Sequence, residues 1–264
     1  MTDADVSASW TPHGSGVLTR ACDHYGGMKT WQALRCVRLF PGRLSGLVPS
    51  IKGFGTTFSL PSAFEIEPHA RRTRFVGFPD RDHVGVFDNG AVHIERRDGA
   101  DVQLMSSTHR QSFTGKAKLR RWGPLDALYF FGYSLAHYHS LPFTLLQARL
   151  LRTRVTRSQT GALDVLDVEL PADLPTHCRR QSFYFDQAGQ LTRHDYHAEI
   201  LGVWARGAHF WKLQERVAGL PIAMERHVVL RLGTTTWPLN ALHATFMDAE
   251  VELDTLHPAT QARS

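Results

Sequence analysis

The sequence opens with a helical pattern of apolar residues and then changes to the short runs that are typical of β-strands. Thr11 and Pro12 form a favourable N-cap and first helical residue, and Gly26 and Gly27 end the element. A second short turn is expected over residues 28–34. We therefore expect an amphipathic N-terminal helix ahead of a β-rich body.

Most of the remaining chain carries β-strand signals. The Asn89-Gly90 pair predicts a tight hairpin because both residues tolerate a positive φ, and Asp186 to Gly189 predict a three-residue hairpin loop. Short strands at regular spacing indicate an antiparallel meander in a sandwich, barrel or half-barrel. The runs that predict strands are residues 54–60, 63–67, 72–78, 83–87, 91–96, 163–170, 177–185, 191–200, 204–217, 222–230 and 244–253.

Residues 123–147 instead have apolar side chains at helical spacing and almost all round the axis. Such a helix must be buried on both sides. It is either a core helix that plugs an open sheet or a cap that supplies aromatic lining to a ligand mouth, and the two interpretations are compatible. We expect a mainly β (α+β) single domain over residues 1–264, a curved antiparallel sheet or unclosed β-barrel, with flexible tails at 1–10 and 256–264.

Composition and charge remove several classes of protein. No run reaches the ~18 apolar residues of a membrane-spanning helix, and the start lacks a signal peptide, so we expect a soluble, cytoplasmic protein. Three widely spaced cysteines fit free thiols in a reducing compartment: Cys22, Cys36 and Cys178. The net charge of +5 is spread along the chain without a DNA- or RNA-binding motif, so no nucleic-acid partner is expected.

Cofactor and metal motifs are missing from the sequence. Fifteen histidines include the close pair His137 and His139, but no HExxH motif or cysteine partner accompanies them. No phosphate-binding loop, dinucleotide fingerprint or GxSxG nucleophile motif occurs either. We therefore expect neither a metal nor a cofactor.

The strand at residues 193–197 is unusual because it places titratable or hydrogen-bonding side chains on both faces. Buried polar groups persist only if they are hydrogen-bonded or face a wet cavity. Counting outward from an Asp186–Gln190 pair predicts that Ser182 lies opposite His194, which separates two candidate sets by parity. One set is Ser182, Tyr184, His194 and Tyr196 with His209; the other is His177, Arg179, Gln181 and Asp195 with Arg206.

Two interpretations of these sets stay open. In the first, Asp195 forms a surface ion pair with Arg179 or Arg193, and His194 is a hydrogen-bonded wall residue. In the second, the catalytic candidates His194, Tyr196 and His209 move protons or orient a ligand, and Asp195 fixes a histidine tautomer. Parity alone does not decide which face is inside.

Several segments resemble a bacterial family of largely uncharacterised proteins. They are Thr176-His177, Gln181, Phe183-Tyr184-Phe185-Asp186, Gly189, Leu191, Arg193-His194-Asp195-Tyr196, Gly202, Trp204-Ala205, Ala208-His209, Gly219, Gly26-Gly27 with Trp31 and Leu34, and Leu128 to Tyr133. The resemblance implies a fold similar to the outer-membrane lipoprotein carriers LolA and LolB, an unclosed β-barrel whose concave side is plugged by helices. That fold would provide a hydrophobic cavity for acyl chains or comparable molecules.

Two functions follow as hypotheses. The first is binding of a small lipophilic acyl, polyketide or terpenoid-like molecule. The second is a cofactor-independent acid–base enzyme, a lyase, isomerase, cyclase or hydrolase, that acts on such a molecule in the same cavity. The expected ligand-binding residues are Tyr129, Phe130, Tyr133, Phe143, Arg179, Gln181, Phe183 and Trp204.

Overall fold

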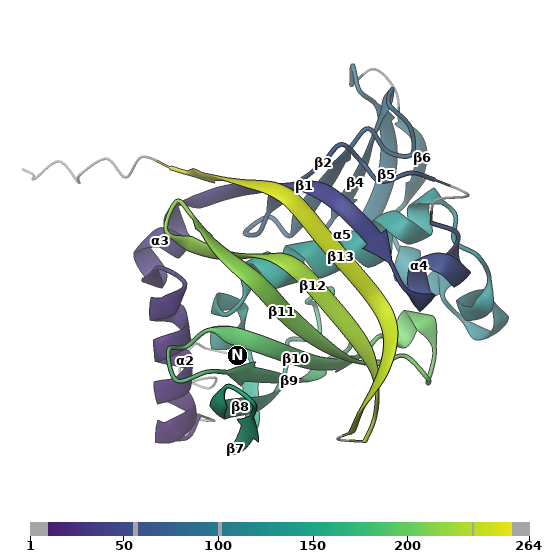
Figure 1. The fold of residues 1–264 in the computed structure, drawn as a ribbon. Coiled ribbons are helices and arrows are strands. Elements are labelled where there is room, and N and C mark those ends of the chain that lie inside the picture. The colour runs from purple at the N-terminus through teal and green to yellow at the C-terminus, as the bar shows by residue number, and fades with distance from the viewer. Residues whose placement is uncertain (1–9, 55–57, 100–101, 234, 255–264) are drawn as a thin grey trace, which may run out of the picture.

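A computed structural model describes residues 10–54, 58–99, 102–233 and 235–254. Within them, thirteen antiparallel strands form one curved sheet in the order β6-β5-β4-β3-β2-β1-β13-β12-β11-β10-β9-β8-β7. The terminal strands β6 and β7 do not pair with each other in this order, so the sheet is not closed. Figure 1 shows helix α5 behind the long strands, on the concave side of the sheet.

The strands are β1 (Leu34–Ser45), β2 (Ala63–Glu67), β3 (Arg72–Val76), β4 (His83–Asp88), β5 (Ala91–Arg96), β6 (Val102–Ser106), β7 (Arg149–Ser158), β8 (Gly161–Glu169), β9 (Arg180–Phe185), β10 (Leu191–His197), β11 (Arg206–Val217), β12 (Leu220–Leu232) and β13 (Thr235–Leu253). The α-helices are α2 (Pro12–His24), α3 (Gly27–Ala33), α4 (Leu47–Lys52) and α5 (Pro124–Ser140). The 3₁₀ helices are η1 (His109–Ser112), η2 (Gly115–Leu119), η3 (Phe143–Gln147) and η4 (Glu199–Leu201).

Helix α5 is the core of the molecule, as its all-round apolar pattern predicts. Gly132 lets the helix backbone approach strand β4 closely, since a Cβ at this position would overlap the side chain of Phe87. The Thr73 hydroxyl on β3 donates to the Gly132 carbonyl over 3.1 Å, which fixes the helix against the sheet. The predicted fold class is therefore confirmed: a mainly β, unclosed sheet with a buried aromatic helix on its concave side.

Helix α2 begins and ends where its sequence predicts. The Thr11 Oγ1 atom accepts a hydrogen bond from the Gly14 amide over 3.2 Å, which caps the helix N-terminus. The helix lies beside the β9–β10 hairpin in Figure 1. A Cβ on Gly189 of that hairpin would overlap the Arg20 backbone, so only glycine fits this contact.

The hairpin prediction is confirmed where the turn has residues with a strong turn preference. Strand predictions are wrong where contacts with distant residues outweigh the local sequence preference. Asn89 and Gly90 adopt φ values of 43° and 107°, which confirms the predicted β4–β5 hairpin. Residues 54–60 do not form the predicted strand in their described part, where Phe54 and Phe58 make an isolated bridge. Strand β1 continues through Pro41, although proline usually marks a turn, because β1 pairs irregularly with β13 there.

Strand β10 pairs with β9 in a register different from the predicted one. The loop forms as expected, with Asp186 and Gln190 hydrogen-bonded through a 3.0 Å backbone contact. The register then shifts between Leu191 and Arg193, so His194 lies opposite Phe183. The predicted pairing of His194 with Ser182 is wrong because a β-bulge inserts one extra residue into β10.

Candidate functional site

The bulge in β10 decides which polar residues face the concave side. Phe183 is fully buried and stacks on the His194 ring with centroids 4.5 Å apart, which places both side chains on the α5 side of the sheet. Cross-strand pairing adds His209 of β11, directly opposite His194. The inward set therefore takes Gln181 from one predicted parity set and His194, Tyr196 and His209 from the other, with Phe183 beside them.

Asp195 belongs to the opposite face of β10. Its carboxylate pairs with the Arg193 guanidinium at 2.7 Å and with Arg231 at 3.5 Å, and it accepts a hydrogen bond from the Tyr184 hydroxyl over 2.9 Å. Adjacent residues of a strand point to opposite sides, so this carboxylate does not contact the His194 ring. The predicted pair of Asp195 with Arg193 is present, but it is buried rather than at the surface, since Asp195 is 4% exposed. Asp195 therefore has no part in fixing the His194 tautomer.

His177 is the centre of a satisfied hydrogen-bond network under α5. Its Nδ1 atom lies 2.8 Å from the Tyr133 hydroxyl and its Nε2 atom 2.6 Å from the Tyr138 hydroxyl. The Tyr196 ring stacks on the imidazole at a centroid distance of 3.9 Å. A neutral imidazole has one donor and one acceptor nitrogen, so one phenol accepts and the other donates.

His194 is held by Gln181 of the neighbouring strand. The amide nitrogen of Gln181 donates to the Cys178 carbonyl over 2.6 Å and to the Thr176 hydroxyl over 2.7 Å, so its oxygen faces His194 Nε2. The His194 Nε2 atom must therefore carry the proton. Its Nδ1 atom has no hydrogen-bond partner among the described residues.

Burial keeps the histidine cluster, defined here as His137, His177, His194 and His209, uncharged. Desolvation lowers the pKa of His137 to about 4, and the pKa values of the other three lie well below the usual 6.5. Desolvation also raises the pKa of Tyr138 to about 12. At neutral pH this network consists of neutral donors and acceptors.

An apolar crevice runs between α5 and strands β1, β2, β3, β12 and β13. About 70 Å³ of its space admits the centre of a water-sized molecule. Arg43 and Thr245 contribute at its more exposed end. Its apolar lining includes Phe54, Leu60, Phe64, Phe75, Phe78, Ala127, Phe130, Phe131, Leu135, Val228, Leu242, Ala244 and Phe246. The polar residues that line it from buried positions are Ser134, Tyr138, Tyr196, His209 and Arg226.

Arg226 is a buried cation in the wall of this crevice. Its side chain lies over the rings of Trp211 and Tyr138, with the guanidinium carbon 4.2 Å and 5.1 Å from their centroids. The residue is 3% exposed, and neither Nε nor Nη1 has a hydrogen-bond partner among the described residues. Desolvation lowers the Arg226 pKa to about 10, which still leaves the group charged at neutral pH.

Arg226 was not predicted as a site residue, although the strand pattern contains a signal for it. Met224, Arg226 and Val228 alternate with Glu225 and His227 in β12. A strand with Met224 and Val228 facing the core must direct Arg226 the same way. An arginine at an apolar position of the alternation is the signal that could have identified it.

The remaining predicted ligand-binding residues lie in several places. Phe130 lines the crevice, Tyr133 binds His177, and Phe143 stacks on Trp31 at 4.8 Å. Trp204 lines a small cavity beside α4. Tyr129 and Arg179 instead line an open cleft on another side of α5. The predicted binding set is therefore spread over more than one cavity.

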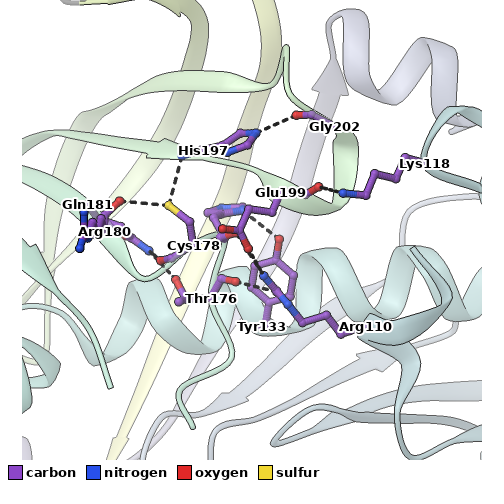
Figure 2. Close-up of polar contacts among 11 residues, drawn as sticks. Arg110, Lys118, Tyr133, Thr176, Cys178, Arg180, Gln181, His197, Glu199 and Gly202 are labelled. Atoms are coloured by element: carbon purple, nitrogen blue, oxygen red, sulfur yellow. Dashed lines mark hydrogen bonds and ion pairs between the residues drawn. The ribbon is translucent and has the colours of Figure 1, made fainter. Parts of the chain in front are cut away.

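Polar contacts join η1 and η2 to η4 and to the connection that precedes β9, beside the open cleft (Figure 2). Arg110 donates to the Thr176 carbonyl over 2.9 Å and pairs with the Glu199 carboxylate at 2.7 Å. Lys118 donates to the Glu199 carbonyl over 2.8 Å. Burial raises the pKa of the Cys178 thiol, which accepts from the His197 amide. These contacts hold the segments that border the cleft in place.

Within the described ranges, no group of three or more histidine, cysteine, aspartate or glutamate side chains is arranged to hold a metal ion. No described helix combines the length and apolarity that crossing a bilayer requires.

Several solved structures are similar to the chain at low sequence identity. One solved structure is a putative outer membrane lipoprotein-sorting protein domain from Vibrio parahaemolyticus, with 11% identity, a TM-score of 0.42, and 83% of this chain and 84% of that chain covered. The LolA superfamily protein NE2245 from Nitrosomonas europaea has 9% identity and a TM-score of 0.43, with 92% and 94% covered.

A protein of the DUF1329 family from Desulfovibrio piger ATCC 29098 has 9% identity and a TM-score of 0.39, with 90% of this chain and 92% of that chain covered. No protein-family model and no curated protein matches the sequence. We therefore base the function on the side chains of this chain.

Proposed function

We propose that the protein binds a small lipophilic molecule whose apolar part occupies the crevice between α5 and the sheet. The main support is the lining, in which aromatic and aliphatic side chains from α5 face those of five strands and the α4–β2 connection. Moving apolar surface from water into such a crevice stabilises a complex by about 25 cal/mol per Å². Concave, mainly apolar sites with a few polar groups are typical of small-molecule binding.

The electrostatics favour holding a molecule over acid–base chemistry. Tyr196 and His209 of the predicted catalytic set line the crevice, but Asp195 lies on the other face of the sheet. An effective general base has a pKa near the working pH. Desolvation, followed by the Arg226 charge, holds the His209 pKa well below 6.5, which makes this ring a weak base at neutral pH.

The test is binding of the neutral fluorescent probe N-phenyl-1-naphthylamine. Ala244 of β13 lines the crevice and is only partly buried, so Ala244→Phe fills space without displacing the core. Losing room for about two methylene groups weakens binding about tenfold. The matched control, Ala162→Phe, adds the same side chain at an exposed position of β8.

We expect saturable binding by the wild type, weaker binding by Ala244→Phe and wild-type binding by Ala162→Phe. Thermal melting checks that both variants are folded. A wild type that does not bind the probe, or two variants with equal affinity, would refute the proposal.

A further inference from the structure

The crevice contains a buried positive charge that has no counterion among the described residues. Arg226 is 3% exposed, and no ion pair involves it among the described residues. Its one polar contact among the described residues is a 3.5 Å approach of Nη2 to His139 Nε2, which is at the limit of a hydrogen bond. Burying an unpaired cation lowers the stability of the fold. We therefore expect such a residue where another group supplies its counterion.

The surroundings of Arg226 supply aromatic faces and no carboxylate. The described residues that line the crevice include neither aspartate nor glutamate. The guanidinium carbon lies over the rings of both Trp211 and Tyr138, which hold the group in place. The cation is therefore positioned before any ligand arrives, which lowers the entropic cost of binding an anion to it.

His209 provides a second unsatisfied group in the same crevice. The residue is 1% exposed, and neither ring nitrogen has a hydrogen-bond partner among the described residues. His209 lies opposite Val228 on β12, two residues from Arg226, and both side chains line the crevice. A neutral imidazole can donate one hydrogen bond to an anion that Arg226 attracts.

We propose that the crevice binds a single-chain carboxylate, with its carboxylate at Arg226 and His209 and its alkyl chain among the phenylalanines of the lining. This inference rests on the proposed function and names its ligand class. The planar guanidinium group matches the two oxygens of a carboxylate, and the narrow crevice suits one unbranched chain. The lining offers one buried cation, which matches a ligand with one negative charge.

The first arm of the test compares ligands on the wild-type protein, which avoids any folding defect. Competition against N-phenyl-1-naphthylamine measures the affinities of decanoate, decanol and decyl phosphate. We expect decanoate to bind at least about tenfold more tightly than decanol, since charge-assisted hydrogen bonds are about twice as strong as neutral ones. Equal affinities of decanoate and decanol, or tighter binding of decyl phosphate, would overturn the proposal.

The second arm removes the cation. Arg226→Met removes the positive charge and keeps an unbranched side chain, so it should abolish the preference for decanoate over decanol. Arg231→Met is the matched control, because Arg231 is on the same strand but pairs with Asp195 on the other face. Its preference for decanoate should equal that of the wild type.

Arg43→Met examines the alternative headgroup position at the exposed end of the crevice. A preference that survives Arg226→Met but disappears in Arg43→Met would overturn the assignment. Failure of the neutral probe to bind the wild type would refute the proposed function itself. Probe binding without a preference for decanoate would refute the carboxylate alone.

Discussion

His177 and Arg226 are both buried on the concave side of the sheet, but they differ in whether their polar atoms have hydrogen-bond partners. His177 has a phenol hydroxyl within 2.8 Å of each ring nitrogen. Arg226 has two nitrogens without a hydrogen-bond partner in the described part of the chain. A satisfied buried group stabilises one arrangement of the core, whereas an unsatisfied one lowers stability until a ligand completes it. The difference separates a structural network from a candidate binding site, although the two are adjacent.

The largest expected effect is loss of stability in acid, which both regions share. The pKa values of His177, His194 and His209 are lowered in the folded state, so the unfolded chain binds more protons below pH 6.5. The stability that comes from their neutral forms is fully present above about pH 6.5. It is lost as the pH falls toward the lowered values, by about 1.4 kcal/mol per pH unit for each histidine.

Urea unfolding at pH 8, 7, 6 and 5 measures this effect. We expect a constant free energy of unfolding above pH 7 and a steep decline below pH 6.5. His209→Leu should reduce the slope by about one histidine's share. A free energy that does not change between pH 7 and pH 5 would contradict the burial of neutral histidines.

The second effect comes from breaking the satisfied network at neutral pH. His177→Leu has a similar volume but leaves the hydroxyls of Tyr133 and Tyr138 without their partner. Each buried polar group left unpaired costs about 1–3 kcal/mol, so we expect a loss of about 3 kcal/mol in urea unfolding at pH 7.5. His209→Leu serves as the control, and it should cost much less because His209 has no described hydrogen bond to lose. Equal losses of unfolding free energy in the two variants would contradict the distinction between a structural network and a candidate binding site.

The smallest effect is expected from removing the unsatisfied cation in the absence of ligand. Arg226→Met should leave the free energy of unfolding unchanged or raise it by about 1 kcal/mol, because the variant no longer buries an unpaired charge. The cation–π contacts with Trp211 and Tyr138 oppose this gain. Thermal and urea unfolding of ligand-free protein measure the balance. A loss above about 2 kcal/mol would show that Arg226 is a structural residue like His177.

Local chemistry determined how much of the fold could be predicted. Asn89-Gly90 and the N-cap at Thr11 act within a few residues, so their signals survive folding unchanged. Phe54 to Leu60 look like a strand by composition, but Phe54, at the described start of this run, packs its ring against Phe131 instead. Pro41 looks like a turn, yet pairing with β13 carries β1 past it. Tertiary partners, which sequence patterns do not contain, decided these two segments.

The candidate site could be predicted in part, for the same reason. The sequence of β10 predicted polar side chains on both faces of this strand. The bulge after Leu191 then shifted the register with β9 by one residue, which mixed the two parity sets. A one-residue change reverses every side-chain direction relative to the partner strand. Arg226 could be predicted only from the alternation of core-facing and outward-facing residues along β12.

The unclosed sheet also has a consequence for self-association. Strand β7 stands at one end of the sheet order, and along it lie Arg149, Arg152, Arg154 and Arg157. Aspartate and glutamate of β8 hold three of these guanidinium groups across the neighbouring strand. A second copy that approached by its own β7 would bring two rows of arginines together. Like charges at a free edge oppose edge-to-edge aggregation, so the arginine row protects the backbone groups that an open sheet leaves exposed.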